Sequence, residues 1–318
     1  MSSKAAEYDF VKPENWQLGS KTHFFLTDLD GTLAASASGR LYSNSARDTV
    51  FFSGTETFIN KYKEDGYTVL IVSNQATYNE QTKEKIRYVV ERLGVPALVA
   101  TGKKSSYRKP SGLLWHIFMQ TYKINMSTIE ELHYTGDAIG SDDVNPAYRW
   151  ASSDKEFAAT ISATFHRPID IIPQWSYEPL IVAAVPKTIY LLIGTPGSMK
   201  STTAALLQAK LPTGSSIHLE QDYIGDRPRM FKAVKKTLEN PDVDYVFVDA
   251  THGSLARRQE IYKLAQTFCW KVHILWSIRD GRPFNALRMQ PVPAIAYNVY
   301  IGRFDNPIND GYPVEIIS

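Results

Sequence analysis

The two halves of the chain each contain short apolar runs separated by polar and helix-forming stretches. The clearest runs are residues 24–26 and 69–72 in the first half, and residues 188–193 and 245–248 in the second. Short runs of this kind, bounded by turn-forming residues, are typical of buried strands. Strands that alternate with helices predict parallel sheets covered by helices. We therefore expect an α/β fold with a mostly parallel sheet in each half.

The length and composition agree with two globular domains. A chain of 318 residues is long enough for two domains of ordinary size, and 43% hydrophobic with 21% charged residues is typical of folded proteins. Pro173, Pro179 and Pro186 interrupt the segment between the halves. The predicted division is an N-terminal extension over residues 1–20, a first domain over 21–170, a linker over 171–186 and a second domain over 187–318.

Two aspartates, Asp28 and Asp30, follow the first apolar run. Strand side chains alternate, so these two carboxylates point the same way, and Gly31 permits a tight turn after them. Carboxylates placed side by side are costly unless they bind a cation or share a reaction. The alternative is a strand-to-loop turn with two solvated aspartates.

Three further polar segments follow in order. Ser73 and Asn74 come after the second run and offer groups that bind phosphate oxygens, Lys109 offers a positive charge, and Asp137 comes at another predicted strand end. Each has a plain alternative, namely a helix cap, a surface lysine and a turn aspartate, but the shared order favours phosphoryl chemistry. In that chemistry Asp28 is the predicted nucleophile and Asp30 the acid and base.

Carboxylates also predict a metal site, because Mg²⁺ prefers oxygen ligands. Asp28, Asp30 and Asp137 are its predicted ligands. One of Asp142, Asp143 and Asp154 is a further candidate to support the metal through water. For Asp142 and Asp143 a solvated acidic loop is the favoured interpretation.

A second phosphate-binding motif lies in the second half. Residues 194–202 read G-T-P-G-S-M-K-S-T between a predicted strand and a predicted helix, as a P-loop requires. Met199 departs from the pattern, because glycine is usual there and a β-carbon costs about 1 kcal/mol if only glycine fits. An intact nucleotide site and a degenerate loop are both open. The predicted ATP-binding residues here are Gly194, Gly197, Lys200, Ser201 and Thr202, with Ser201 also bound to Mg²⁺.

Two strand-end aspartates and an arginine-rich stretch follow the loop. Asp222 and Asp249 are each placed to act as a base or to support a metal, and Arg279, Arg282 and Arg288 could close over phosphates as a lid. Any one of these arginines alone would be interpreted as a surface residue.

Together these motifs resemble the polynucleotide kinase 3′-phosphatase family, in its two-domain form without a forkhead-associated domain. The resemblance rests on D-L-D-G-T-L at 28–33, S-N-Q at 73–75, L-V-A-T at 98–101, Y-R-K-P at 107–110, G-D-A at 136–138, the P-loop and V-D-A-T at 248–251. It implies a haloacid-dehalogenase-like (Rossmann-like) phosphatase domain followed by a P-loop kinase domain.

The resemblance also implies roles for individual residues. Asp28 matches the phosphatase nucleophile, Asp30 its acid and base, Ser73 and Lys109 phosphate ligands, Asp137 a Mg²⁺ ligand, Lys200 and Ser201 nucleotide ligands, Asp222 the base for a 5′-hydroxyl, and Arg282 and Arg288 lid residues. Mg²⁺ is the expected cofactor and ATP the expected phosphoryl donor. One departure besides Met199 is Asp249-Ala250-Thr251-His252, where the family has D-N-T-N.

The expected partners are DNA ends that carry a 3′-phosphate or a 5′-hydroxyl, with RNA as an open alternative. Basic residues crowd beyond Asp222 and before Lys109, although a solvated helix face explains the former equally well. Two alternatives to a bifunctional enzyme are a 3′-phosphatase whose P-loop domain only binds strands, and a small-molecule phosphatase fused to an unrelated P-loop domain.

The sequence gives little information about the cellular location of the protein. The first twenty residues contain no apolar secretory signal, no stretch approaches a membrane span, and a single cysteine, Cys269, favours a reducing compartment. The family resemblance implies a nuclear location, with cytoplasmic and viral settings open. A monomer is expected.

Overall fold

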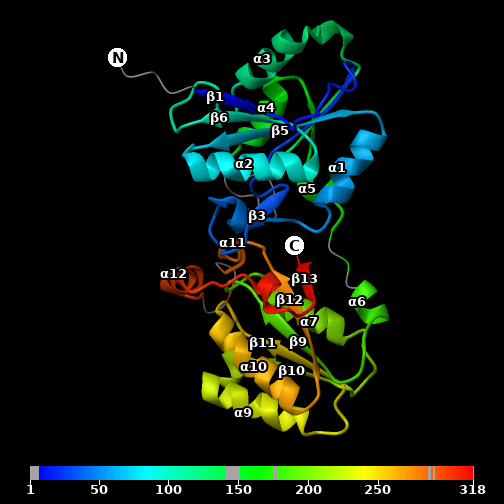
Figure 1. The fold of residues 1–318 in the computed structure, drawn as a ribbon, viewed down its shortest axis with the longest axis vertical. Coiled ribbons are helices and arrows are strands. Elements are labelled where there is room, and N and C mark those ends of the chain that lie inside the picture. The colour runs from blue at the N-terminus through cyan, green and yellow to red at the C-terminus, as the bar shows by residue number, and fades with distance from the viewer. Residues whose placement is uncertain are drawn as a thin grey trace. The chain divides into compact units, whose positions relative to one another are not determined.

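The computed structural model describes residues 7–140, 151–174, 176, 178–285, 288 and 291–317 (Figure 1). The chain divides into two compact units, Met1–Ser36 with Tyr42–Gln174 and Ala37–Leu41 with Trp175–Ser318. Asp142 and Asp143 lie outside the described residues.

The first unit is built on a six-stranded sheet with the order β1-β6-β5-β2-β7-β8. All neighbours in it are parallel except β1 and β6, so the prediction of a mostly parallel sheet is confirmed. The strands are β1 (Tyr8–Val11), β2 (His23–Thr27), β5 (Thr68–Gln75), β6 (Ala97–Thr101), β7 (Glu131–Thr135) and β8 (Thr164–His166), with a separate pair, β3 (Ala34–Ser36) and β4 (Thr49–Phe51). The helices are α1 (Thr55–Glu64), α2 (Glu80–Leu93), α3 (Leu113–Tyr122), α4 (Ser153–Thr160) and α5 (Pro168–Ile171).

Alternating side chains of the central strands divide the core of this unit into two layers. Phe25 packs with α1 and α2, whereas Phe24 and Leu26 pack with α3 and α4 on the opposite face. An unbroken apolar run suits a strand covered on both faces. The apolar runs of the sequence are therefore explained by helices on both sides of the sheet.

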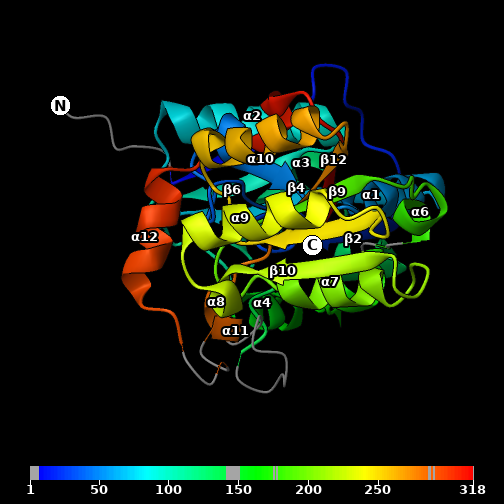
Figure 2. The same ribbon diagram turned by 90° about the horizontal axis from the view of Figure 1, so that it is seen from below.

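The second unit contains a fully parallel sheet with the order β10-β11-β9-β12-β13. Helices α7 and α9 contact its strand β10, and Figure 2 shows them on opposite sides of that strand. The strands are β9 (Thr188–Ile193), β10 (Ser216–Glu220), β11 (Tyr245–Asp249), β12 (Lys271–Ser277) and β13 (Val314–Ile317). The helices are α6 (Glu178–Val182), α7 (Lys200–Gln208), α8 (Gln221–Ile224), α9 (Arg227–Leu238), α10 (Leu255–Thr267), α11 (Arg282–Asn285) and α12 (Ala294–Gly302).

Two segments differ from the plain extension and linker expected from the sequence. Residues 8–11 of the expected extension form β1, which pairs with β6. Helix α6 lies within the expected linker over 171–186, and its Leu180 is buried in the core of the second unit. Both segments contribute to a folded unit because each supplies packing or hydrogen bonds to a sheet or its core.

A buried ion pair links α10 to the C-terminal part of the second unit. The guanidinium of Arg258 donates to both oxygens of Asp310, at 2.6 and 3.0 Å, and Tyr262 Oη donates to the same carboxylate at 2.5 Å. Arg258 Nη1 also donates to the carbonyls of His252 and Gly253. The arginine thereby holds the loop that follows β11.

We expect Asp310→Ala to lower the free energy of unfolding of the second unit by about 3–5 kcal/mol, because it leaves the Arg258 charge buried and unpaired. Urea titration followed by tryptophan fluorescence measures the change. The matched control is Glu260→Ala, which removes the exposed partner of Arg227 and should cost about 1 kcal/mol or less. Equal effects of the two substitutions would contradict the role given to the buried pair.

Candidate active sites

Lys109 is the centre of a buried charged group at the carboxyl end of the first sheet. Its Nζ lies 2.6 Å from Asp28 Oδ1 and 2.6 Å from Asp154 Oδ1. Tyr134 Oη accepts a hydrogen bond from Lys109 Nζ at 2.8 Å and donates to Asp154 Oδ1 at 2.7 Å. Asp154 is fixed further by the backbone N–H of Ala138, at 2.9 Å from its Oδ2. Two carboxylates and a phenol thus orient one ammonium group.

The strand arrangement explains why these residues meet. Asp28 follows β2, and its N–H donates to the carbonyl of Thr135 at the end of the neighbouring strand β7. Asp137 comes two residues after that strand. Since parallel strands end at the same edge of a sheet, the sequence prediction that joined Asp28, Lys109 and Asp137 agrees with the geometry.

Burial governs the protonation of this group. Burial raises the pKa of Asp28 to about 7, with Lys109 opposing the shift and Asp154 adding to it. Burial and the charge of Asp28 raise the pKa of Asp137 well above its usual value. Burial lowers the pKa of Lys109, but the charges of Asp154 and Asp28 outweigh it, so that pKa is raised. Lys109 is therefore held as a cation among carboxylates that it does not fully neutralise.

The donor set fits the predicted Mg²⁺. Carboxylate oxygens of Asp28, Asp137 and Asp154 lie within 4.8 Å of one another. Burial and mutual repulsion oppose ionisation of the carboxyl groups of Asp28 and Asp137, and a divalent cation would offset that repulsion. Oxygen ligands also suit Mg²⁺. Asp154 joins this group in place of Asp30. Nothing in the spacing of Asp154 from the other residues pointed to this role.

Asp30 has a different environment because Lys85 occupies both of its oxygens. Lys85 Nζ, which is fully buried, donates to Asp30 Oδ1 and Oδ2 at 2.7 and 2.8 Å. Gln75 Nε2 and Ser43 Oγ add hydrogen bonds at 2.9 and 3.2 Å. Sequence reasoning missed Lys85. The available signal was its place on the buried face of α2, one position before Ile86.

Ser73 and Asn74, which were predicted to bind phosphate together with Lys109, differ in their contacts. The hydroxyl of Ser73, at the end of β5, is buried and accepts a hydrogen bond from Gln75 Nε2 at 2.8 Å. Asn74 instead bonds the backbone of Lys109, accepting from its N–H at 2.9 Å and donating to its carbonyl at 3.2 Å. Asn74 therefore positions Lys109, because both ends of its amide are engaged by that residue's backbone.

The segment predicted to be a P-loop joins β9 to α7. Gly194 and Gly197 have φ values of +153° and +77°. A β-carbon on Gly194 would lie 2.6 Å from Ser198 Oγ and 2.8 Å from the carbonyl oxygen of Ser277, so glycine is required there. Lys200 Nζ donates to the carbonyl of Thr195 within the loop at 2.7 Å. Ser201 and Thr202 lie exposed in the first turn of α7.

Met199 occupies the left-handed conformation that the missing glycine would favour. Its φ is +65°, and Arg279 Nη1 lies 3.1 Å from its Sδ atom. For residues other than glycine this conformation costs roughly 1–2 kcal/mol. Helix α7 nevertheless begins at Lys200, directly after Met199. The chain therefore accommodates methionine in place of glycine through backbone strain at this one residue.

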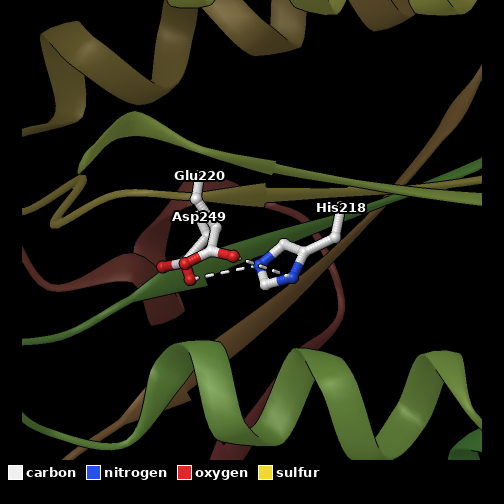
Figure 3. Close-up of side chains that lie close together, drawn as sticks. All are labelled: His218, Glu220 and Asp249. Atoms are coloured by element: carbon white, nitrogen blue, oxygen red, sulfur yellow. Dashed lines mark hydrogen bonds and ion pairs between the residues drawn. The ribbon is translucent and has the colours of Figure 1, made fainter. Parts of the chain in front are cut away.

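Asp249 lies beside the loop at the end of β11. It accepts hydrogen bonds from the Ser201 hydroxyl and from His218 Nε2, the latter at 3.2 Å (Figure 3). Burial raises the pKa of Asp249, but the hydrogen bond from His218 and the charge of Lys200 outweigh it and leave that pKa low. Burial lowers the pKa of Lys200 to about 8, with Asp249 and Asp222 opposing the shift. A metal-supporting role for Asp249 fits this geometry.

The predicted base and lid residues make ion pairs in this structure. Asp222 lies in α8 with a largely exposed side chain, and its Oδ2 is 2.8 Å from Arg288 Nη2. Arg282 Nη1 is 2.9 Å from Asp280 Oδ1, and its guanidinium lies 5.2 Å from the centre of the Tyr297 ring. The structure thus brings Arg288, but not Arg282, into contact with Asp222.

The basic stretch beyond Asp222 forms helix α9 and is partly paired with acids. Arg227 pairs with Glu260, and Arg229 lies 3.7 Å from Asp226. Such pairs on an exposed helix agree with the simpler interpretation of this stretch as a solvated face.

Comparison with known proteins shows similarity to phosphatases and kinases that act on polynucleotides. Residues 23–171 match the family model described as Polynucleotide kinase 3 phosphatase. The bifunctional polynucleotide phosphatase/kinase of Schizosaccharomyces pombe is 28% identical over 91% of this chain and 78% of the relative. The first half of the chain is thus similar to the polynucleotide kinase 3 phosphatase family, and most of the chain is similar to a bifunctional phosphatase/kinase. These similarities identify the protein as an enzyme.

Solved structures are similar to parts of this chain. A fungal RNA kinase is 17% identical, with a TM-score of 0.35 over 42% of this chain and 38% of its own. The D,D-heptose 1,7-bisphosphate phosphatase of B. bronchiseptica is 14% identical, with a TM-score of 0.35 over 45% of this chain and 79% of its own. Within the described part of the chain, no helix combines the length and the hydrophobicity needed to cross a membrane.

We expect Asp137→Asn to weaken Mg²⁺ binding by about tenfold or more, because it removes one charged oxygen ligand from the buried carboxylate group. Isothermal titration of the metal-free protein with Mg²⁺ measures the affinity. Asp65→Asn, a change in an exposed carboxylate at the end of α1, is the matched control. Unchanged Mg²⁺ affinity in Asp137→Asn would exclude this residue as a ligand.

Proposed function

We propose that this chain is a bifunctional enzyme that hydrolyses 3′-phosphates at nucleic-acid ends and phosphorylates 5′-hydroxyls with ATP. The observation that carries the phosphatase part is the contact of Asp28 with Lys109 beside Asp137. The kinase part rests on the P-loop between β9 and α7. The similarity to a bifunctional polynucleotide phosphatase/kinase over most of the chain supports the combination.

In the phosphatase reaction, Asp28 attacks the phosphorus atom and the bond to the 3′-oxygen breaks. Asp30 protonates that leaving oxygen, then takes a proton from the water that hydrolyses the aspartyl-phosphate. Lys109 offsets the charge on the transferred group, which makes the approach of carboxylate and phosphate less costly. Mg²⁺, held by Asp28, Asp137 and Asp154, would supply further positive charge.

The contact between Lys85 and Asp30 positions the proposed acid and base. The buried ammonium group donates to both carboxylate oxygens and so fixes the orientation of the Asp30 side chain. Ser73 is placed to bind a phosphate oxygen through its hydroxyl.

In the kinase reaction, the backbone N–H groups of the P-loop and Lys200 bind the phosphates of ATP. Asp222 accepts the proton of the 5′-hydroxyl, and its exposed side chain is accessible to a strand. Arg282 and Arg288 would close over the nucleotide. Ser201, which bonds Asp249, would hold Mg²⁺ for this reaction.

DNA ends are the proposed substrates, and the enzyme would act in DNA repair in the nucleus. RNA ends are the alternative substrate. Assays with matched DNA and RNA oligonucleotides that carry a 3′-phosphate decide between them.

One observation favours a second candidate for the P-loop unit. Met199 holds a left-handed conformation and its sulfur contacts Arg279. A loop altered in this way could serve a unit that binds strands without transferring phosphate. A failure of the wild-type protein to bind ATP would support that candidate.

Asp28→Asn should reduce phosphate release from a 3′-phosphorylated oligonucleotide by at least ~10³-fold, because the nucleophile is lost. Malachite green detection of free phosphate measures the rate. Transfer from ATP to a 5′-hydroxyl oligonucleotide should persist, since it uses the other unit. Phosphate release at the wild-type rate would rule out Asp28 as the nucleophile.

Met199→Gly should keep or raise the rate of 5′-phosphorylation, because glycine adopts the φ of this position without strain. Transfer of labelled phosphate from ATP measures the rate, and titration with ATP and Mg²⁺ measures binding. Lys200→Ala is the negative control and should abolish transfer while sparing 3′-phosphate release. A rate that falls more than tenfold in Met199→Gly would mean that the methionine contributes to the active loop.

A further inference from the structure

A histidine and two carboxylates lie together at the carboxyl end of the second sheet (Figure 3). His218 and Glu220 are two residues apart on β10, so their side chains share one face of the strand. Asp249, on the parallel neighbour β11, is the register partner of Glu220. One ligand atom from each of the three lies within 4.8 Å of the others. The positions of these three residues are set by the pairing of β10 with β11 and not by the conformation of a loop.

The two carboxylates face each other across neighbouring strands, where like charges repel. Asp249 is almost fully buried, with 5% of its side chain exposed, and Glu220 is 28% exposed. The imidazole of His218 faces both carboxylates, with Nε2 3.2 Å from Asp249 Oδ2 and Nδ1 3.6 Å from Glu220 Oε1 (Figure 3). A positive charge in this space would relieve the repulsion.

The distance between His218 and Asp249 matches that between two ligands of one metal ion. Two ligand atoms that are each about 2.1 Å from a tetrahedrally bound ion lie about 3.4 Å apart. The separation of His218 Nε2 and Asp249 Oδ2, 3.2 Å, is close to this value. A metal ion in place of the proton on His218 Nε2 therefore requires little movement of His218 or Asp249. The side chain of Glu220 is more exposed and can rotate toward the ion.

We propose that His218, Glu220 and Asp249 bind one divalent transition-metal ion, of the Mn²⁺ or Zn²⁺ class. The imidazole nitrogen sets this site apart from the oxygen-only group of Asp28, Asp137 and Asp154, because nitrogen ligands favour transition metals over Mg²⁺. The hydrogen bond from Ser201 orients the Asp249 carboxylate, as outer partners of metal ligands commonly do. Binding at this site does not depend on the proposed kinase reaction.

Pulsed electron paramagnetic resonance of bound Mn²⁺ tests the proposal on the untagged, full-length protein. A histidine ligand couples its nitrogen to the manganese electron spin, and the carboxylate group of the first unit offers no histidine. We expect nitrogen coupling in the wild type that changes when the histidines are labelled with ¹⁵N. His218→Gln should abolish the coupling. The matched control, His133→Gln, alters a partly buried histidine of the first unit and should leave the coupling intact.

The carboxylates are tested by affinity. Glu220→Gln and Asp249→Asn should each weaken the histidine-coupled Mn²⁺ site about tenfold or more. Thermal melting by circular dichroism checks that the variants are folded. Absence of nitrogen coupling in the wild type at millimolar Mn²⁺ overturns the proposal without reference to any variant. Coupling that persists in folded His218→Gln overturns the assignment of His218.

Discussion

Both candidate sites depend on the way parallel strands end. Strands β2 and β7 are neighbours in the first sheet, and β9 and β11 are neighbours in the second. Because parallel neighbours end at the same edge, residues far apart in sequence meet there. Asp28 thereby meets Asp137, and the P-loop meets Asp249. The folds provide this edge, and the residues placed on it provide the chemistry.

Negative charges at the buried edge of the first sheet require positive partners, and each aspartate of the D-L-D motif has a different one. Lys109 lies between Asp28 and Asp154, whereas Lys85 bonds both oxygens of Asp30. The two carboxylates of the D-L-D motif therefore have separate ammonium partners. The separate partners suit the separate roles proposed for the two carboxylates, namely attack by Asp28 and proton exchange by Asp30.

The sequence predicted the features that depend on local patterns. The strand over residues 188–193 has the predicted bounds, and both sheets are mostly parallel as expected. The meeting of Asp28, Lys109 and Asp137 could also be predicted, because each follows a recognisable strand end or family motif.

The partners from other elements could not be predicted. Lys85 comes from the middle of a helix and Asp154 from the start of another, and neither stands at a fixed distance from a motif. Asn74 was expected to bind phosphate, yet its amide is used by the backbone of Lys109. Such contacts depend on how the helices pack on the sheet. A short sequence pattern does not specify that packing.

The central claim is that Asp28 carries the phosphoryl group during turnover. Rapid acid quench of the wild-type protein with a 3′-phosphorylated oligonucleotide, followed by borohydride reduction and peptide mass spectrometry, tests it directly. An acyl phosphate is reduced to an alcohol, so the account predicts conversion of Asp28 to homoserine during turnover and not in protein without substrate. Reduction at a different carboxylate, or continued phosphate release with Asp28 unmodified at every quench time, would contradict it.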